Sequence, residues 1–263
     1  MPNWNSAAVL AAGSLLVATG CSKGHETELT VAAAADLTGA FNELGDAFAK
    51  TSGGVHPTFT FGSTGLLAKQ LEQGAPFDVF AAANVSYVSQ VEANGACDTT
   101  TEKMYARGRL VLWWRNGATI APPSALQDLA DARFVHVSIA NPEHAPYGRA
   151  AEEALSSAGV MEAVKPKLVF GENVQQAFQT AQTGNADVAI VALSLAINDK
   201  KGAYVTIDQG FHAPIDQAMV VCRHGKGPGL GKQFTEFVGG PAGRAVMQRY
   251  GFLLPGETMA AVH

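Results

Sequence analysis

Four short segments of the chain combine small residues, hydroxyl groups and backbone amides in a way that suits anion binding. They are residues 34–37, 62–65, 141–148 and 171–174. Each follows an apolar run and precedes a stretch with helical spacing, so each is expected to open a helix. The first turn of a helix has unpaired N–H groups and the positive end of the peptide dipole. Such a helix start binds anions without any charged side chain.

The side chains in these openings have both structural and functional interpretations. Asp36 is a good N-cap residue, which explains it without any ligand. Ser63 and Thr64 place two hydroxyls between two glycines, a combination that also occurs in ordinary turns. Asn173 is also a natural cap. Helix capping explains each opening taken alone, but it does not explain why one chain has four of them.

The third opening contains two prolines, Pro142 and Pro146, which predict an extended loop. This loop delivers the N–H groups of Tyr147 and Gly148 at a helix start. The hydroxyl of Tyr147 is either a further donor or a contact at the rim.

Neutral donors of this kind favour one class of ligand. Each charge-assisted hydrogen bond contributes about 1.5–3 kcal/mol, so about six or seven converging donors suffice for micromolar binding after association costs. Such donors favour a fully deprotonated dianion, such as molybdate, tungstate or sulfate. Phosphate usually carries a proton near neutral pH and needs an acceptor.

Alternating apolar runs and helical patterns predict an α/β fold with parallel-type sheets covered by helices. Strands are expected at residues 29–35, 55–61, 78–82, 109–114, 134–139, 168–170, 188–192 and 218–222. Helices are expected at residues 37–48, 66–74, 148–158, 174–183, 232–238 and 242–250. In such sheets, ligands sit where strand ends meet helix starts. The four openings occupy this kind of position.

The composition excludes several function classes. The chain has 263 residues, of which 47% are hydrophobic and 16% charged, as expected of a compact soluble protein. The net charge is −5 and no segment is rich in Lys and Arg, so no nucleic-acid partner is expected. No CxxC pair or Cys/His spacing indicates a metal site, and no cofactor is expected.

The N-terminal region indicates export. The apolar run at residues 7–18 is too short to span a bilayer and suits a signal peptide. Small residues before Cys21 resemble a bacterial lipoprotein cleavage site, with residues 1–21 as signal peptide, Cys21 as lipidated N-terminus and residues 22–28 as tether. Ala18 stands where Leu is usual, and no Lys or Arg precedes the run. Ordinary signal cleavage or a misplaced start codon are therefore alternatives.

Export would place Cys97 and Cys222 in an oxidising compartment. The sequence leaves open whether they form a disulfide or remain two buried thiols, because their geometry is not known.

Seven segments together resemble the periplasmic molybdate-binding proteins of ABC importers. They are AAAADL (32–37), FGSTG (61–65), QGAPFDVF (73–80), GRLVLW (108–113), NPEHAPYGRA (141–150), GENV (171–174) and VALS (191–194). No segment is specific alone, but their order and spacing are. The similarity extends from about residue 29 to 252.

The resemblance implies the two-lobed periplasmic binding protein fold of type II, which closes by a hinge motion. It places residues 29–107 and 220–256 in lobe 1 and residues 108–219 in lobe 2, with chain crossings near 108 and 218. It also implies that the oxyanion ligands are Asp36, Ser63, Thr64, Tyr147 and Val174.

The resemblance further implies molybdate or tungstate as ligand, an ABC transporter permease as partner, a monomeric state, and a location in the periplasm or cell envelope. One branch of the family has a tyrosine ligand where this chain has Ala192. Another branch has a tyrosine like Tyr147, and this chain is similar to that branch.

Relatives usually have Ser or Asn at the position of Asp36, and a carboxylate there repels an oxyanion. Asp36 therefore either caps its helix or accepts a hydrogen bond from a protonated ligand such as phosphate. A phosphate- or sulfate-binding protein of the same fold stays an alternative.

An enzyme is the remote alternative. Ser63, Ser194 and His144 are available for a hydrolase, but the sequence has no GxSxG elbow and no HxxxH spacing. Glu143 and His144 are interpreted as polar loop residues. The chain is therefore not expected to be an enzyme. A structural or adhesive lipoprotein, which would show no response to small anions, is an equally remote possibility.

Overall fold

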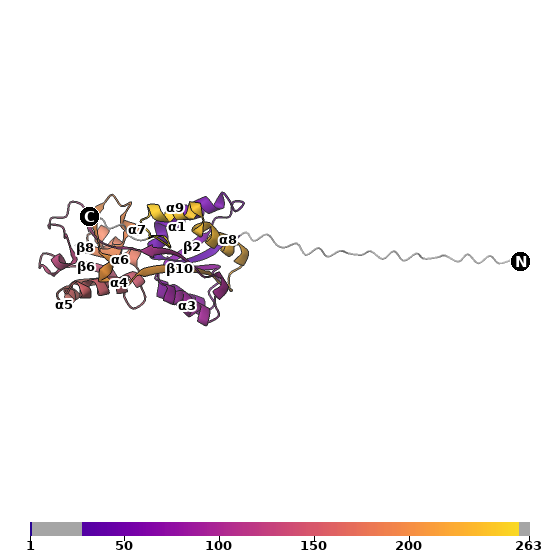
Figure 1. The fold of residues 1–263 in the computed structure, drawn as a ribbon, viewed down its shortest axis with the longest axis horizontal. Helices are drawn as coiled ribbons and strands as arrows, with labels where there is room; N and C mark the ends of the chain where they lie inside the picture. The colour runs from indigo at the N-terminus through magenta and orange to yellow at the C-terminus, as the bar shows by residue number, and fades with distance from the viewer. Residues whose placement is uncertain (2–27, 258–263) are drawn as a thin grey trace.

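The computed structural model describes residue 1 and residues 28–257, which form two α/β lobes side by side (Figure 1). The expected signal peptide, Cys21 and most of the tether lie outside the described residues. No helix in the described part of the chain is long and apolar enough to cross a membrane.

The first lobe contains a five-stranded mixed sheet in the order β2-β1-β3-β10-β4. β1 is parallel to β2 and β3, whereas β10 is antiparallel to β3 and β4. Its strands are β1 Thr30–Ala34, β2 Thr58–Gly62, β3 Val79–Ala82, β4 Lys103–Gly108 and β10 Ile215–Val221. Its helices are α1 Thr38–Ala49, α2 Thr64–Glu72, α3 Val85–Ala93, α8 Pro228–Gly239 and α9 Pro241–Arg249.

The second lobe repeats this plan with the sheet order β7-β6-β8-β5-β9. β6 is parallel to β7 and β8, and β5 is antiparallel to β8 and β9. Its strands are β5 Leu110–Arg115, β6 Val137–Ala140, β7 Leu168–Gly171, β8 Val188–Ala192 and β9 Gly202–Thr206. Its helices are α4 Pro146–Ser157, α5 Met161–Val164, α6 Val174–Gln182 and α7 Leu193–Ala196.

Both sheets are therefore mixed, and the expectation of parallel-type sheets holds only for the strands joined by crossover helices. The antiparallel strands are the ones that follow the passage of the chain from one lobe to the other. A strand that enters a sheet from the hinge has no crossover helix to reverse its direction.

The chain crosses between the sheets twice. The first crossing is at Arg109, between β4 and β5, close to the expected position. The second lies between Thr206 and Ile215, earlier than the expected 218–220. The start of β10 contains two polar residues, Asp216 and Gln217, which interrupt the apolar run from which the strand was predicted.

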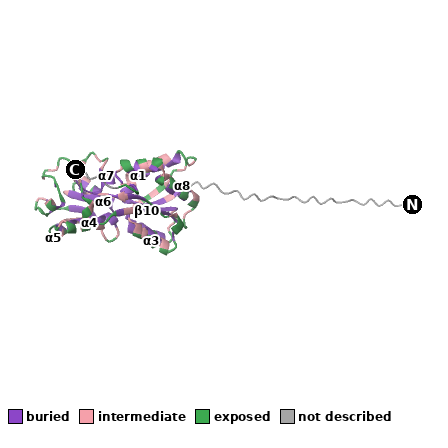
Figure 2. Ribbon diagram, in the orientation of Figure 1, coloured by how far each residue is buried: buried purple, intermediate pink, exposed green. Residues whose placement is uncertain are grey.

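In each lobe the buried residues are concentrated in the sheet and on the helix faces that cover it (Figure 2). β1, β3, β6 and β8 are almost wholly buried, as the central strands of sheets covered on both faces must be. In lobe 1, Phe41 of α1 packs edge-on against Phe234 of α8. In lobe 2, Trp113 of β5 packs edge-on against Phe178 of α6. These cores hold the strand ends that form the site.

Cys97 and Cys222 form a disulfide bond, which settles the question that the sequence left open. Both residues are buried, and they pair across an isolated antiparallel bridge between the segment after α3 and the end of β10. The bond thus joins parts of lobe 1 that are 125 residues apart in sequence.

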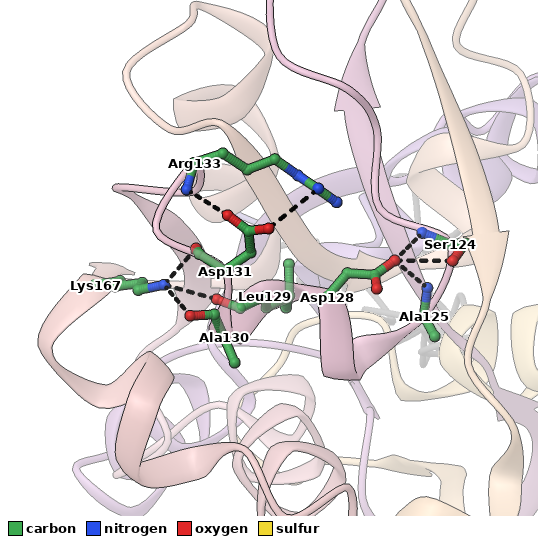
Figure 3. Close-up of polar contacts among 8 residues, drawn as sticks. All are labelled: Ser124, Ala125, Asp128, Leu129, Ala130, Asp131, Arg133 and Lys167. Carbon is green, nitrogen blue, oxygen red and sulfur yellow. Dashed lines mark hydrogen bonds and ion pairs between the residues drawn. The ribbon is translucent and has the colours of Figure 1, made fainter.

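The connection between β5 and β6 is held by polar contacts of several side chains (Figure 3). The ammonium group of Lys167 donates to three successive backbone carbonyls, those of Leu129, Ala130 and Asp131. Asp128 accepts from the backbone amides of Ser124 and Ala125. These contacts cap the two ends of the short 3-10 helix Leu126–Ala130. They are therefore explained by the fold, without a ligand.

Candidate anion-binding site

One small cavity lies between the lobes, where the loops after β1, β2, β6 and β7 meet. Its wall consists of Ala34, Ala35, Asp36, Gly62, Ser63, Thr64, Ala83, Ala145, Pro146, Tyr147, Asn173 and Val174. All five residues that the sequence analysis predicted as ligands are in this wall. None of these wall residues is a Lys or Arg. The structure thus brings the predicted residues together, and their role as ligands stays a prediction.

Three helices begin at this cavity. α2 starts at Thr64, α4 at Pro146 and α6 at Val174, and each has at least nine residues. Their positive dipole ends therefore meet in one place, which favours a negative ligand. The cap expected at Asn173 is confirmed, because its side chain accepts a hydrogen bond from the amide of Gln176 at 3.0 Å.

The side chain of Asp36 does not cap a helix, so that interpretation is wrong. Asp36 lies inside a 3-10 turn, Ala35–Leu37, that runs directly into α1, and its side chain makes no cap hydrogen bond. Instead its Oδ2 atom accepts from Gln217 Nε2 at 2.7 Å and from Tyr147 Oη at 3.1 Å. Its Oδ1 atom is buried and has no hydrogen-bond partner in the described chain.

Burial raises the pKa of Asp36 to about 6, although the hydrogen bonds from Gln217 and Tyr147 favour the ionised form. The pKa of Tyr147 is raised well above 10, first by burial and then by the negative charge of Asp36. Tyr147 is therefore a protonated donor at any physiological pH. Asp36, by contrast, changes its charge close to neutrality.

Gln217 and Tyr105 complete a hydrogen-bond network behind Asp36 that the sequence analysis missed. Tyr105 Oη donates to Gln217 Oε1 at 2.8 Å, which turns the amide nitrogen of Gln217 towards Asp36 and Tyr147. The two residues lie on β4 and β10, neighbouring strands from distant parts of the sequence. No local pattern could have indicated that they meet.

The hydroxyl of Ser63 is directed at His144 rather than into the cavity. It donates to the backbone carbonyl of His144 at 2.6 Å and lies 2.7 Å from its Nδ1 atom. The amide of Gly65 donates to the same carbonyl at 2.9 Å. His144, interpreted from sequence as a polar loop residue, thus joins lobe 2 to the start of α2 in lobe 1.

Thr64 takes part in a contact within lobe 1. Its Oγ1 atom accepts a hydrogen bond from the amide of Ala83 at 3.2 Å, a bond that does not use the hydroxyl proton. Thr64 therefore keeps a donor in the cavity wall.

Further contacts hold the two lobes against each other. Ser194 of α7 donates to the backbone carbonyl of Asp36 at 2.7 Å. The guanidinium group of Arg149 lies 5.2 Å from the ring centre of Tyr87, a distance suited to a cation–π contact. Together with the contacts of His144 and Tyr147, these bonds define a closed arrangement of the lobes.

The contact between Ser63 and His144 is the nearest approach to a nucleophile and base. It lacks two features of such a pair, because the hydroxyl proton is donated to a carbonyl and no carboxylate hydrogen-bonds to the imidazole within residues 28–257. The contact between Ser63 and His144 instead fits a structural role in which it holds the two lobes together.

Comparison with known proteins identifies the family. Residues 29–253 match the bacterial extracellular solute-binding proteins. The chain belongs to this family. It is 36% identical to the molybdate-binding protein ModA of Azotobacter vinelandii, over 93% of this chain and 96% of that one. It is 34% identical to ModA of Rhodobacter capsulatus, over 86% of this chain and 88% of the relative.

This solute-binding protein also resembles a solved structure, that of the Azotobacter vinelandii periplasmic molybdate-binding protein. The TM-score is 0.80 at 28% sequence identity, and the match covers 87% of this chain and all of the other. The two-lobed binding-protein fold expected from the sequence is therefore confirmed.

Proposed function

We propose that this solute-binding protein captures molybdate or tungstate between its lobes and delivers the ion to an ABC transporter permease. The observation that carries the proposal is the meeting of three helix starts and the loop after β1 around a cavity without Lys or Arg in its wall. The names of the two relatives, both molybdate-binding proteins, support the choice of ion.

Uncharged donors are well matched to a doubly negative ion. Backbone amides at the three helix starts and the hydroxyl of Thr64 replace its water shell, and the helix dipoles offset its charge. The proposed ligand set is Asp36, Ser63, Thr64, Tyr147 and Val174. Because Ser63 and Val174 lie at helix starts, their amides contribute whichever way their side chains point.

The proposal extends to the setting of the protein. The protein acts as an exported monomer held at the cell envelope by lipid on Cys21, and the proposal includes neither a cofactor nor a nucleic-acid partner. The support for the anchor is the row of small residues before Cys21, and that for a permease is membership of the solute-binding family. Mass spectrometry of the protein purified from membranes tests the anchor, because an unmodified Cys21 contradicts it.

Calorimetry with molybdate, tungstate, sulfate and phosphate tests the choice of ligand. We expect molybdate and tungstate to bind with micromolar affinity or better, and sulfate to bind far more weakly because its bonds are shorter and its oxygens reach fewer donors. Tighter binding of phosphate would overturn this choice and favour the phosphate alternative. Catalytic hydrolysis of activated esters or phosphates would contradict the expectation that the protein is not an enzyme.

A further inference from the structure

The cavity wall contains a single carboxyl group, that of Asp36, which is only 1% exposed to solvent. This placement conflicts with the binding of a dianion. An ionised carboxylate that is this deeply buried repels a negative ligand strongly, because little solvent screens the two charges. A form of Asp36 that tolerates the ion must therefore exist if the proposed function is correct.

The hydrogen-bond network shows which oxygen of Asp36 can carry a proton. Oδ2 accepts one hydrogen bond from Tyr147 and another from Gln217, so it acts as an acceptor. The carbonyl oxygen of Gln217 accepts from Tyr105, so its amide nitrogen is the atom that faces Asp36. Oδ1 has no hydrogen-bond partner in residues 28–257, so it is the oxygen that is protonated when Asp36 is neutral.

We propose that Asp36 binds the oxyanion in its protonated form, donating a hydrogen bond from Oδ1, and that capture of a dianion takes up one proton from the medium. This inference rests on the proposed function and adds a specificity-determining role for Asp36. The ionised side chain excludes dianions and the neutral one becomes a ligand. The proton adds to Oδ1 without breaking any bond in the network.

The groups around Asp36 agree with this assignment. Tyr147 on α4 and Tyr105 on β4 both have a raised pKa and stay neutral. Arg109, between β4 and β5, interacts with Tyr147, whereas the ring of His144 contacts the hydroxyl of Ser63. No salt bridge in the described residues includes Asp36, so no cation holds it in the ionised form.

The raised pKa of Asp36 supports the coupling and sets its range. With a pKa of about 6, Asp36 is protonated in roughly one-tenth of the protein molecules near pH 7. A dianion beside it raises that pKa further, so binding takes up about 0.9 proton per ion at this pH. The affinity should then fall about tenfold per pH unit above neutrality and level off below about pH 6.

Hydrogen phosphate would behave differently at the same residue. It brings its own proton, which the ionised Oδ1 can accept, so its capture needs no proton from the medium. The direction of proton exchange thus separates a protonated Asp36 that donates from an ionised Asp36 that accepts.

Calorimetric titration of the protein with molybdate and with tungstate tests the inference. Repeating each titration near pH 7.5 in buffers of different ionisation enthalpy measures the protons taken up. We expect close to one proton per ion, and an affinity that falls with pH as described. These measurements on the unchanged protein do not depend on any variant.

Asp36→Asn is the decisive variant, because the amide oxygen can still accept from Tyr147 and Gln217 while the amide nitrogen donates at the place of Oδ1. We expect it to take up no proton, to bind with the same affinity from about pH 6 to about pH 8.5, and to bind at least tenfold more tightly than the unchanged protein near pH 8. Asp46→Asn removes the same charge at an exposed site and serves as control.

Two results would overturn the inference while leaving the proposed function intact. One is tight binding of either ion by the unchanged protein with no proton uptake. The other is an Asp36→Asn variant that folds, as judged by urea unfolding, and keeps the same pH dependence. Absence of molybdate and tungstate binding at every pH, in both proteins, would instead overturn the proposed function and the inference with it.

Discussion

Gly65→Ala probes the closed arrangement of the lobes at its tightest point. A Cβ atom at this position would lie 2.8 Å from the backbone oxygen of His144 and 3.0 Å from the hydroxyl of Tyr87. The tyrosine hydroxyl ends a flexible side chain and can move away. The carbonyl is part of the backbone, so the loop of lobe 2 must move off the start of α2.

Moving that loop loses two hydrogen bonds to one carbonyl, those from the amide of Gly65 and the hydroxyl of Ser63. Each bond contributes about 0.5–1.5 kcal/mol, so the closed form loses about 1–3 kcal/mol. If ligand binding requires closure, this loss weakens the affinity for molybdate by about 5- to 150-fold. The free energy of unfolding should change little, because the lobes can relieve the contact by opening.

Calorimetry with molybdate and urea unfolding, performed on the same preparations, measure these two effects. Gly239→Ala is the matched control, because a Cβ atom there meets no atom within 4 Å. Unchanged affinity in a folded Gly65→Ala variant would refute the reasoning, since it would mean that the contact between Gly65 and His144 is absent from the ligand-bound protein.

Three further predictions concern stability. The folded-state pKa of Asp36, about 6, lies above its usual 3.8. The free energy of unfolding should therefore fall by up to about 3 kcal/mol as the pH rises from about 4 through 6. Urea unfolding of the Asp36→Asn variant should show no such decrease. Cys222→Ser should lower the free energy of unfolding by about 2–4 kcal/mol by removing the bond to Cys97, and reductant should destabilise the unchanged protein but not this variant. Asn173→Ala should lose about 1 kcal/mol in thermal or urea unfolding, because the amide at the start of α6 loses its cap.

Most strands and helices of both lobes were predictable because they depend on local patterns. Buried runs such as that of β8 and the one-sided apolar spacing of α6 occur within single segments. β4 and the start of β10 were missed because their polar residues interrupt the apolar runs. α3 was also missed, since only two of its nine residues are buried.

The sequence by itself determined where the site's backbone donors lie, because a strand, a turn of small residues and a helix start follow one another along the chain. It also indicated the cap at Asn173 for the same local reason. Only the tertiary structure decided how the side chains are used. Gln217 reaches Asp36 across 181 residues and His144 reaches Ser63 across 81, through strand pairing and contact between lobes. Such contacts depend on how distant segments pack, and they alone set the charge and orientation of the groups in the cavity.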